Sequence, residues 1–186
     1  FGVDELEERK AMVDLLHLEN ASNVLEIGCG TGRDTELIAN KLRSGAKLFA
    51  QDISISMLHK AVERLHSFDA DIEFSVANGC CLPFPDNYFD SVFHFGGLNT
   101  FSDIPRAFAE IARVTKPGGR VVIGDESMPP WLRKTEFGKI LMNSNPHYSF
   151  SIPFDSLPVE ARNVCLRWVI GGVFYVFDFS INDGEP

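Results

Sequence analysis

The sequence lacks long apolar runs, clusters of basic residues and a cysteine framework. Its longest apolar stretch, residues 168–177, contains a glycine pair and is far shorter than the ~20 residues that a membrane helix needs. The 17 Lys and Arg residues are outnumbered by 26 Asp and Glu residues, which gives a formal net charge of −9. Nucleic acids and anionic membrane surfaces attract cationic proteins, so we expect neither as a partner, and no integral membrane contact.

Cysteine is also scarce. Cys29, Cys80, Cys81 and Cys165 are too few for a disulfide framework in 186 residues and do not have zinc-site spacing. We therefore expect four reduced thiols, no metal site and a cytoplasmic location. The chain begins with an acidic segment and without Met, which predicts no signal peptide and suggests a trimmed chain.

The composition is that of one globular domain over residues 1–186, because 45% of the residues are hydrophobic and 23% are charged. Between residues 22 and 125, short apolar runs alternate with segments of helical periodicity. Strands are predicted at 22–27, 47–51, 71–77, 89–95 and 120–125, and helices at 4–19, 33–42, 54–66 and 103–114. Strands that are apolar on both faces indicate a parallel sheet covered by helices, so the chain is predicted to be a doubly wound α/β protein.

The pattern changes after Asp125. Residues 129–158 contain five prolines and one predicted helix, at 131–142. Two runs rich in β-forming residues, 164–170 and 173–180, flank Gly171 and Gly172, which predicts a hairpin with a two-residue turn. The sheet is thus expected to have seven strands, mostly parallel, and to end in an antiparallel hairpin. Residues 126–160 would be an insertion between strands five and six.

The strongest local signal is the stretch VLEIGCGTG from Val24 to Gly32, in which a strand enters a loop with glycine at every second position. Glycine lets a ligand lie against bare backbone, and the helix that follows offers free N–H groups. A dinucleotide-binding loop would space its glycines G-x-G-x-x-G, and Glu26 would repel a pyrophosphate. The same carboxylate suits a ligand with an ammonium group. A plain tight turn would need neither three glycines nor the acid.

These residues resemble the first motif of the class I S-adenosylmethionine-dependent methyltransferases, and most closely the ubiquinone/menaquinone-biosynthesis-like subgroup. The resemblance is strongest from Leu15 to Asp125. It implies a Rossmann-like fold, S-adenosyl-L-methionine as the cofactor, and methyl transfer to an O, C or N atom of a small molecule. An aromatic, irregular insertion over the cofactor crevice favours a lipophilic or aromatic substrate.

The resemblance also suggests which residues bind the cofactor. Asp52, which ends the second strand, takes the position of the acid that binds ribose; the alternative is a cap for the next helix. Ile53 is expected to pack on the adenine. Asn78 stands where the family often has an Asp that accepts from the adenine amino group, with an ordinary Asn-Gly turn as the alternative. The other expected cofactor residues are Glu26, Gly28, Cys29, Gly30, Gly32, Gly79, Cys80, His94 and Phe95.

Catalytic and substrate residues are harder to predict, because an activated methyl donor needs a general base only for weakly acidic acceptors. His94 is the candidate base, and a structural histidine is the alternative. Expected substrate contacts are Asn99, after strand four, and Trp131, Phe137, His147 and Tyr148 in the insertion. The insertion alternatively just covers the sheet edge. A cofactor-binding protein without catalysis and a protein methyltransferase remain alternative functions, and the oligomeric state is not predicted.

Overall fold

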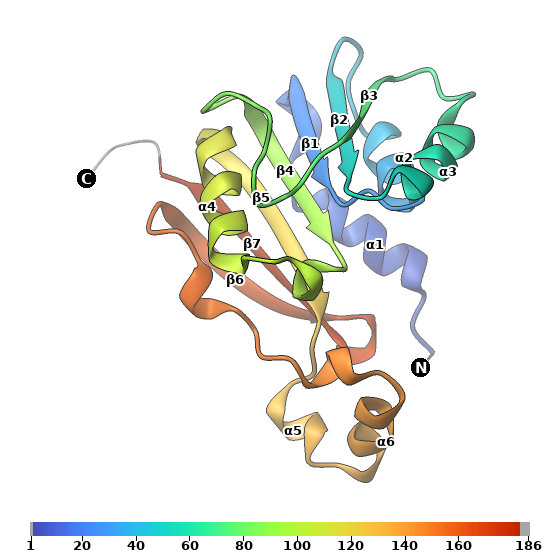
Figure 1. The fold of residues 1–186 in the computed structure, drawn as a ribbon, viewed down its shortest axis with the longest axis vertical. Helices are drawn as coiled ribbons and strands as arrows, with labels where there is room; N and C mark the ends of the chain where they lie inside the picture. Colours follow the sequence, from blue (N-terminus) through green and yellow to red (C-terminus); the bar gives the residue numbers. More distant parts are fainter. Residues whose placement is uncertain (1, 183–186) are drawn as a thin grey trace.

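The computed structural model describes residues 2–182, which form a seven-stranded sheet with helices on both faces (Figure 1). The strand order is β3-β2-β1-β4-β5-β7-β6. The first five strands run parallel, whereas β7 is antiparallel to both β5 and β6. This confirms the predicted doubly wound sheet with its C-terminal hairpin. The strands are β1 (Asn23–Ile27), β2 (Lys47–Asp52), β3 (Asp71–Val76), β4 (Phe89–Phe95), β5 (Thr115–Glu126), β6 (Ala161–Val169) and β7 (Phe174–Ile181).

Four helices connect or precede the parallel strands, and each lies within its predicted range. They are α1 (Glu5–Asp14), α2 (Arg33–Ala39), α3 (Ile55–Leu65) and α4 (Ile104–Val114). The start of α4 is set locally: the Asp103 carboxylate accepts a hydrogen bond from the Arg106 N–H, and Pro105 lies in the first turn, where its missing N–H costs nothing.

An apolar cluster on each face of the sheet forms most of the core. On one face, Phe108 of α4 packs with Phe89 and Phe177 of the sheet. On the other, Met12 of α1 packs with Phe93 of β4. All five side chains are at most 2% exposed. Burial on both sheet faces is what the almost continuous apolar runs of the parallel strands predict.

Two predictions for the C-terminal part are wrong in detail. The single helix expected at 131–142 is two helices, α5 (Pro130–Arg133) and α6 (Glu136–Ser144). The chain breaks at Thr135, whose hydroxyl accepts a hydrogen bond from the Gly138 N–H and so caps α6. The hairpin is present, but its turn is longer than Gly171-Gly172. β6 ends at Val169 and β7 begins at Phe174, and Ile170 in this turn also has a positive φ.

The segment between β5 and β6 follows the carboxyl ends of the parallel strands. Figure 1 shows α5 and α6 as a small lobe beyond the ends of β4 and β5, at the lower end of the molecule. Within residues 2–182, no helix combines the length and the apolar character needed to cross a bilayer.

Candidate functional site

A cavity of about 480 Å³ lies at the carboxyl ends of β1, β2 and β4. In the strand order, β1 lies between β2 and β4: the chain continues from β1 to β2 on one side and crosses from β3 to β4 on the other. Such a switch point opens a crevice at the strand ends and is the usual ligand site of doubly wound sheets. The walls come from the loops that follow β1, β2, β3 and β4, together with α1.

The glycines of the loop after β1 differ in what surrounds them. Gly28, Gly30 and Gly32 all have positive φ, the region that favours glycine. A Cβ at Gly30 would meet no atom within 4 Å, so this backbone faces open space in the cavity wall. A Cβ at Gly32 would instead lie 3.2 Å from Ala61 of α3. Gly32 thus allows helix packing and does not line the cavity.

Asp52, at the end of β2, holds the glycine loop in place. One carboxylate oxygen accepts from the Gly30 N–H at 2.9 Å, and the other accepts from the Ser54 N–H at 2.7 Å. Each carboxylate oxygen can accept a further hydrogen bond, so Asp52 retains acceptor capacity toward the cavity that it lines. Ile53 beside it is 72% exposed and also lines the cavity, as does Cys29.

Asn78 and Gly79 form another part of the wall, after β3. The Asn78 side-chain oxygen accepts from the Cys80 N–H at 2.9 Å, which leaves the amide NH₂ to act as a donor. A Cβ at Gly79 would lie 2.5 Å from the Phe101 ring, so no larger residue fits without movement. Cys80 is buried and does not line the cavity, whereas Cys81 is exposed.

His94 and Phe95 end β4 at the cavity. The His94 Nδ1 lies 2.7 Å from the Ile27 carbonyl oxygen. A carbonyl only accepts, so Nδ1 carries the proton and Nε2 has the free lone pair. Burial lowers the pKa of His94, which keeps the ring neutral. Nε2 is buried and has no hydrogen-bond partner among residues 2–182, so His94 presents an unused acceptor at this site.

Glu26 lies on β1, beneath the glycine loop rather than in the cavity wall. Its side chain is buried, and one carboxylate oxygen has no hydrogen-bond partner within the described chain. Burial, reinforced by the nearby Asp34 carboxylate, raises the pKa of Glu26 to about 8. Glu26 is therefore mainly protonated at neutral pH until a cation approaches it.

Arg9 of α1 is a cavity residue that sequence reasoning missed. Its Nη1 donates to both carboxylate oxygens of Asp34, at 2.8 and 2.6 Å. Its guanidinium lies 5.0 Å from the centre of the Phe95 ring. Arg9, Asp34 and Phe95 all line the cavity. Only the fold brings α1 to this site, so spacing in the sequence gives no signal for Arg9.

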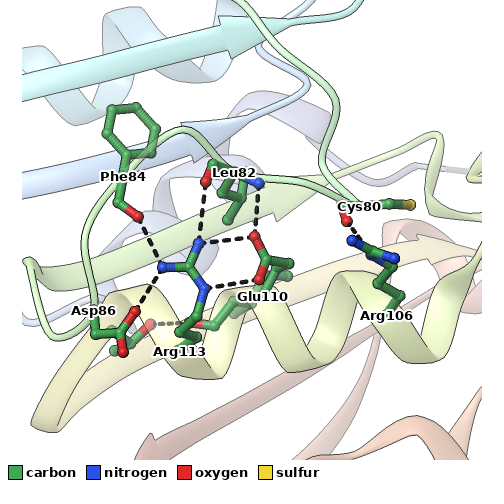
Figure 2. Close-up of polar contacts among 9 residues, drawn as sticks. Cys80, Leu82, Phe84, Asp86, Arg106, Glu110 and Arg113 are labelled. Atoms are coloured by element: carbon green, nitrogen blue, oxygen red, sulfur yellow. Dashed lines mark hydrogen bonds and ion pairs between the residues drawn. The ribbon is translucent and has the colours of Figure 1, made fainter.

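The loop after β3 is held against α4 by Arg113, which sequence reasoning also missed (Figure 2). The Arg113 guanidinium donates to the carbonyl oxygens of Leu82 and Phe84, at 3.0 and 2.8 Å, and to the Glu110 carboxylate. Glu110 in turn accepts from the Leu82 N–H at 2.8 Å. These contacts fix the loop that also carries Asn78. The i,i+3 spacing of Glu110 and Arg113 was a detectable signal for their pairing, though not for their hold on the loop.

The five residues expected to contact substrate do not line this cavity. Asn99 links two strand ends instead, because its side-chain amide donates to the Glu126 carbonyl oxygen at 2.9 Å. The His147 Nδ1 lies 3.6 Å from a carboxylate oxygen of Glu126, whose pKa is raised to about 7, chiefly by burial. The others lie in or just after the α5–α6 lobe: Trp131, Phe137 and Tyr148. Their role in substrate binding stays a prediction.

Comparison with known proteins identifies the fold's family. Residues 25–123 match the family model described as a methyltransferase domain. The chain belongs to this family. The match contains the glycine loop, Asp52, Asn78 and His94, and it confirms the family predicted from the sequence.

Two curated relatives are named as methyltransferases that act in ubiquinone/menaquinone biosynthesis or on demethylmenaquinone. A ubiquinone/menaquinone biosynthesis C-methyltransferase of Francisella tularensis subsp. novicida is 34% identical over 131 residues, which are 69% of this chain and 52% of the relative. A demethylmenaquinone methyltransferase of Corynebacterium urealyticum is 40% identical over 129 residues, again 69% of this chain and 52% of the relative. The chain thus spans about half the length of the curated relatives it matches.

Solved structures share the fold. Phosphoethanolamine N-methyltransferase 2 of Haemonchus contortus, crystallised with S-adenosyl-L-methionine, has a TM-score of 0.75 at 18% identity, over 95% of this chain and 52% of that one. A SAM-dependent methyltransferase of Aquifex aeolicus has a TM-score of 0.66 at 18% identity, over 93% and 89%. The [4+2]-cyclase SpnF has a TM-score of 0.61 at 25% identity, over 67% and 46%. The Rossmann-like methyltransferase fold is thereby confirmed.

Proposed function

We propose that the cavity binds S-adenosyl-L-methionine and that the protein transfers its methyl group to a small lipophilic molecule. The observation that carries this proposal is the set of groups around one cavity: a glycine backbone that faces open space, a carboxylate with acceptor capacity, and a neutral histidine with an unused acceptor. Family membership and the relatives' names support the same reading.

The residues present fit the chemical groups of this cofactor. Asp52 has acceptor capacity for the ribose hydroxyls, and the exposed Ile53 beside it offers an apolar surface to the adenine. Asn78 would donate through its amide NH₂ to an adenine ring nitrogen. Its oxygen accepts from the Cys80 N–H and retains a second lone pair, so acceptance from the adenine amino group stays a prediction.

The amino-acid end of the cofactor carries a carboxylate and an ammonium group. Arg9 is the cationic side chain of the cavity wall that lies beside Phe95, and it would attract the carboxylate. Glu26 lies beneath the glycine loop, and an ammonium group nearby would favour its ionised form. Binding is therefore expected to release a proton from Glu26 at neutral pH.

When bound, the cofactor supplies an activated methyl group; the chain's own residues must orient the acceptor and exclude water. His94 is the candidate base, because its Nδ1–H donates to the Ile27 carbonyl and leaves the buried Nε2 as the basic atom. An acceptor that loses an O–H proton as it is methylated would need such a base.

The substrate class rests on relatives and on the cavity wall. One curated relative is named as a C-methyltransferase of ubiquinone and menaquinone biosynthesis, and the other as a methyltransferase of demethylmenaquinone. The wall beyond His94 contains Phe95, Phe101 and the glycine pair Gly96-Gly97, which suits an apolar acceptor. A reduced quinone ring with a lipophilic tail has an ionisable hydroxyl. When this hydroxyl loses its proton, a ring carbon becomes nucleophilic.

Turnover with labelled methyl donor tests the proposal. We expect label in a hydroquinone with a short prenyl tail, and a His94→Gln variant with lower kcat and an unchanged affinity for S-adenosylhomocysteine. A protein that binds S-adenosylhomocysteine yet labels no member of a panel of hydroquinones, phenols, amines and protein substrates would overturn the enzyme assignment and favour a binding protein. Label in protein substrates alone would indicate a protein methyltransferase.

A further inference from the structure

The lobe formed by residues 130–144, which includes α5 and α6, has a composition unlike the rest of the protein. Three basic residues and one acidic residue give it a net charge of +2, whereas the remaining residues carry −11. The prediction that anionic membrane surfaces are excluded rested on the net charge of the whole chain and on the lack of Lys and Arg clusters. The positive charge of this lobe requires that prediction to be revised locally.

The same lobe exposes large apolar side chains. Trp131 is 67% exposed, Ile140 is 66% exposed and Phe137 is 48% exposed. Phe137 and Ile140 are three residues apart on α6 and therefore share a helix face. Three large exposed apolar side chains within one lobe of 15 residues point to an interaction site.

The lobe presents these side chains on a closely packed scaffold. A Cβ at Gly138 would lie 2.0 Å from the Leu132 carbonyl oxygen, so α5 and α6 touch through backbone. Arg133 ties the lobe to the segments before and after it, since its guanidinium donates to the carbonyl oxygens of Met128 and Phe150. These contacts hold the lobe in one shape while Trp131 and Ile140 remain outside the core.

The basic residues belong to the same short stretch of chain as the exposed apolar side chains. Lys134 is exposed and has no ion-pair partner among the described residues, while Lys139 pairs with Glu136 at 2.6 Å. The guanidinium of Arg133 is bound by neutral oxygens, so its positive charge is retained. Apolar and aromatic side chains next to uncompensated cations are the combination that binds the surface of an anionic bilayer.

We infer that the 130–144 lobe docks on the surface of anionic phospholipid membranes, with Trp131, Phe137 and Ile140 in the interface and Lys134 near the lipid phosphates. A second copy of the chain is the less favoured occupant, because two lobes of charge +2 would repel each other. Figure 1 shows the lobe beyond the carboxyl ends of β4 and β5, the end of the sheet that carries the cavity. A lipophilic acceptor in the membrane would thus lie on the side from which it must enter.

Vesicle flotation of the full chain tests the inference without any need for turnover, so its failure and the failure of the proposed function are distinguishable. Vesicles contain phosphatidylcholine with or without phosphatidylglycerol. We expect binding to the anionic vesicles that weakens as salt rises. The double variant Trp131→Ser, Ile140→Ser should bind at least tenfold more weakly, because two exposed side chains lose their apolar burial. Lys134→Glu should weaken binding to anionic vesicles alone, by about tenfold.

Matched controls come from α3, outside the lobe. Val62 is 45% exposed and Lys60 is exposed, so Val62→Ser and Lys60→Glu repeat the chemical changes elsewhere. Both should bind vesicles like the parent protein. With Trp168→Phe as background, the emission of Trp131 should shift to the blue on binding. Absence of vesicle binding, equal losses in the controls, or a dimer by light scattering that the double variant abolishes would each overturn the inference.

Discussion

Gly30 offers the sharpest single test of how the cavity holds a ligand, because its backbone faces open space. Replacement by Ala adds one methyl group where no atom lies within 4 Å, so the protein itself has room for it. The cost to folding comes from the backbone, since Gly30 has a φ of +55°. An L-residue in this region loses about 1–2 kcal/mol, which a domain with a typical stability of 5–15 kcal/mol tolerates.

A ligand that lies against this backbone would meet the new methyl group. Forcing a methyl group into a fitted contact costs about 1–3 kcal/mol, and 1.4 kcal/mol corresponds to a factor of ten in affinity. We therefore expect Gly30→Ala to weaken binding of S-adenosylhomocysteine at least about fivefold, and Gly30→Val to weaken it further.

Gly45 is the matched control for Gly30. It also has a positive φ, +80°, and open space at its Cβ, but it lies in the turn before β2 and outside the cavity. Gly45→Ala should therefore lower the unfolding free energy as much as Gly30→Ala does and leave affinity unchanged. Calorimetric titration and chemical denaturation of both variants provide the two readouts. Equal affinities in the two variants would refute the close approach of the ligand to Gly30.

Three further changes probe other parts of the site. Arg113→Ala should lower the unfolding free energy by about 1–3 kcal/mol and weaken cofactor binding several-fold, because the Leu82 and Phe84 carbonyls in the loop after β3 lose their hydrogen bonds to Arg113. The control Lys10→Ala removes a surface ion pair and should change neither value measurably. Glu26→Gln should flatten the pH dependence of stability. The pKa of Glu26 is raised to about 8, so the parent protein loses stability as pH rises from about 4.5 toward 8, by at most about 1.4 kcal/mol per pH unit. A difference in denaturation midpoint between the two proteins that stays the same at every pH would contradict the buried acid. Arg9→Gln should weaken binding of S-adenosylhomocysteine more than binding of adenosine, and equal losses for both ligands in calorimetry would argue against a contact with the carboxylate.

The parallel sheet with its C-terminal hairpin and the place of the cavity could be predicted from the sequence because local signals repeat along it. Alternation of short apolar runs with helical periodicity fixes a parallel sheet, and the loop from Gly28 to Gly32 marks its switch point. Asp52 and Asn78 follow neighbouring strands, so their shared edge was predictable as well. His94 was predicted at the cavity for the same reason.

The features that could not be predicted depend on contacts between distant parts of the chain. Arg9 reaches the cavity through the packing of α1, and Arg113 binds a loop about 30 residues away in sequence, at Leu82. The motif also did not show that Gly32 faces α3 or that Glu26 is buried beneath the loop. A glycine-rich motif specifies the backbone path, but the neighbours of each residue are set by the tertiary fold.

The helix break at Thr135 is an intermediate case. The residues Thr135 and Glu136 are a helix-start signal within the apolar periodicity of 131–142, and the continuous periodicity concealed it. The close contact between Gly138 and the Leu132 carbonyl then requires the chain to turn back on itself. The resulting lobe carries the exposed aromatic residues that the sequence assigned to substrate binding.

Asp52 is proposed to hold the ribose of S-adenosyl-L-methionine in this cavity. The test is calorimetric titration of S-adenosylhomocysteine into three proteins: the parent protein, Asp52→Ala and the control Asp71→Ala. Asp71 begins β3 and therefore lies at the end of the sheet away from the cavity. The account predicts one site in the parent protein, an unchanged affinity in the control, and a loss of about 1.5–3 kcal/mol in Asp52→Ala, or roughly tenfold to hundredfold, because the lost acceptor is charged. No binding to the parent protein, or equal affinity in all three proteins, would contradict the account.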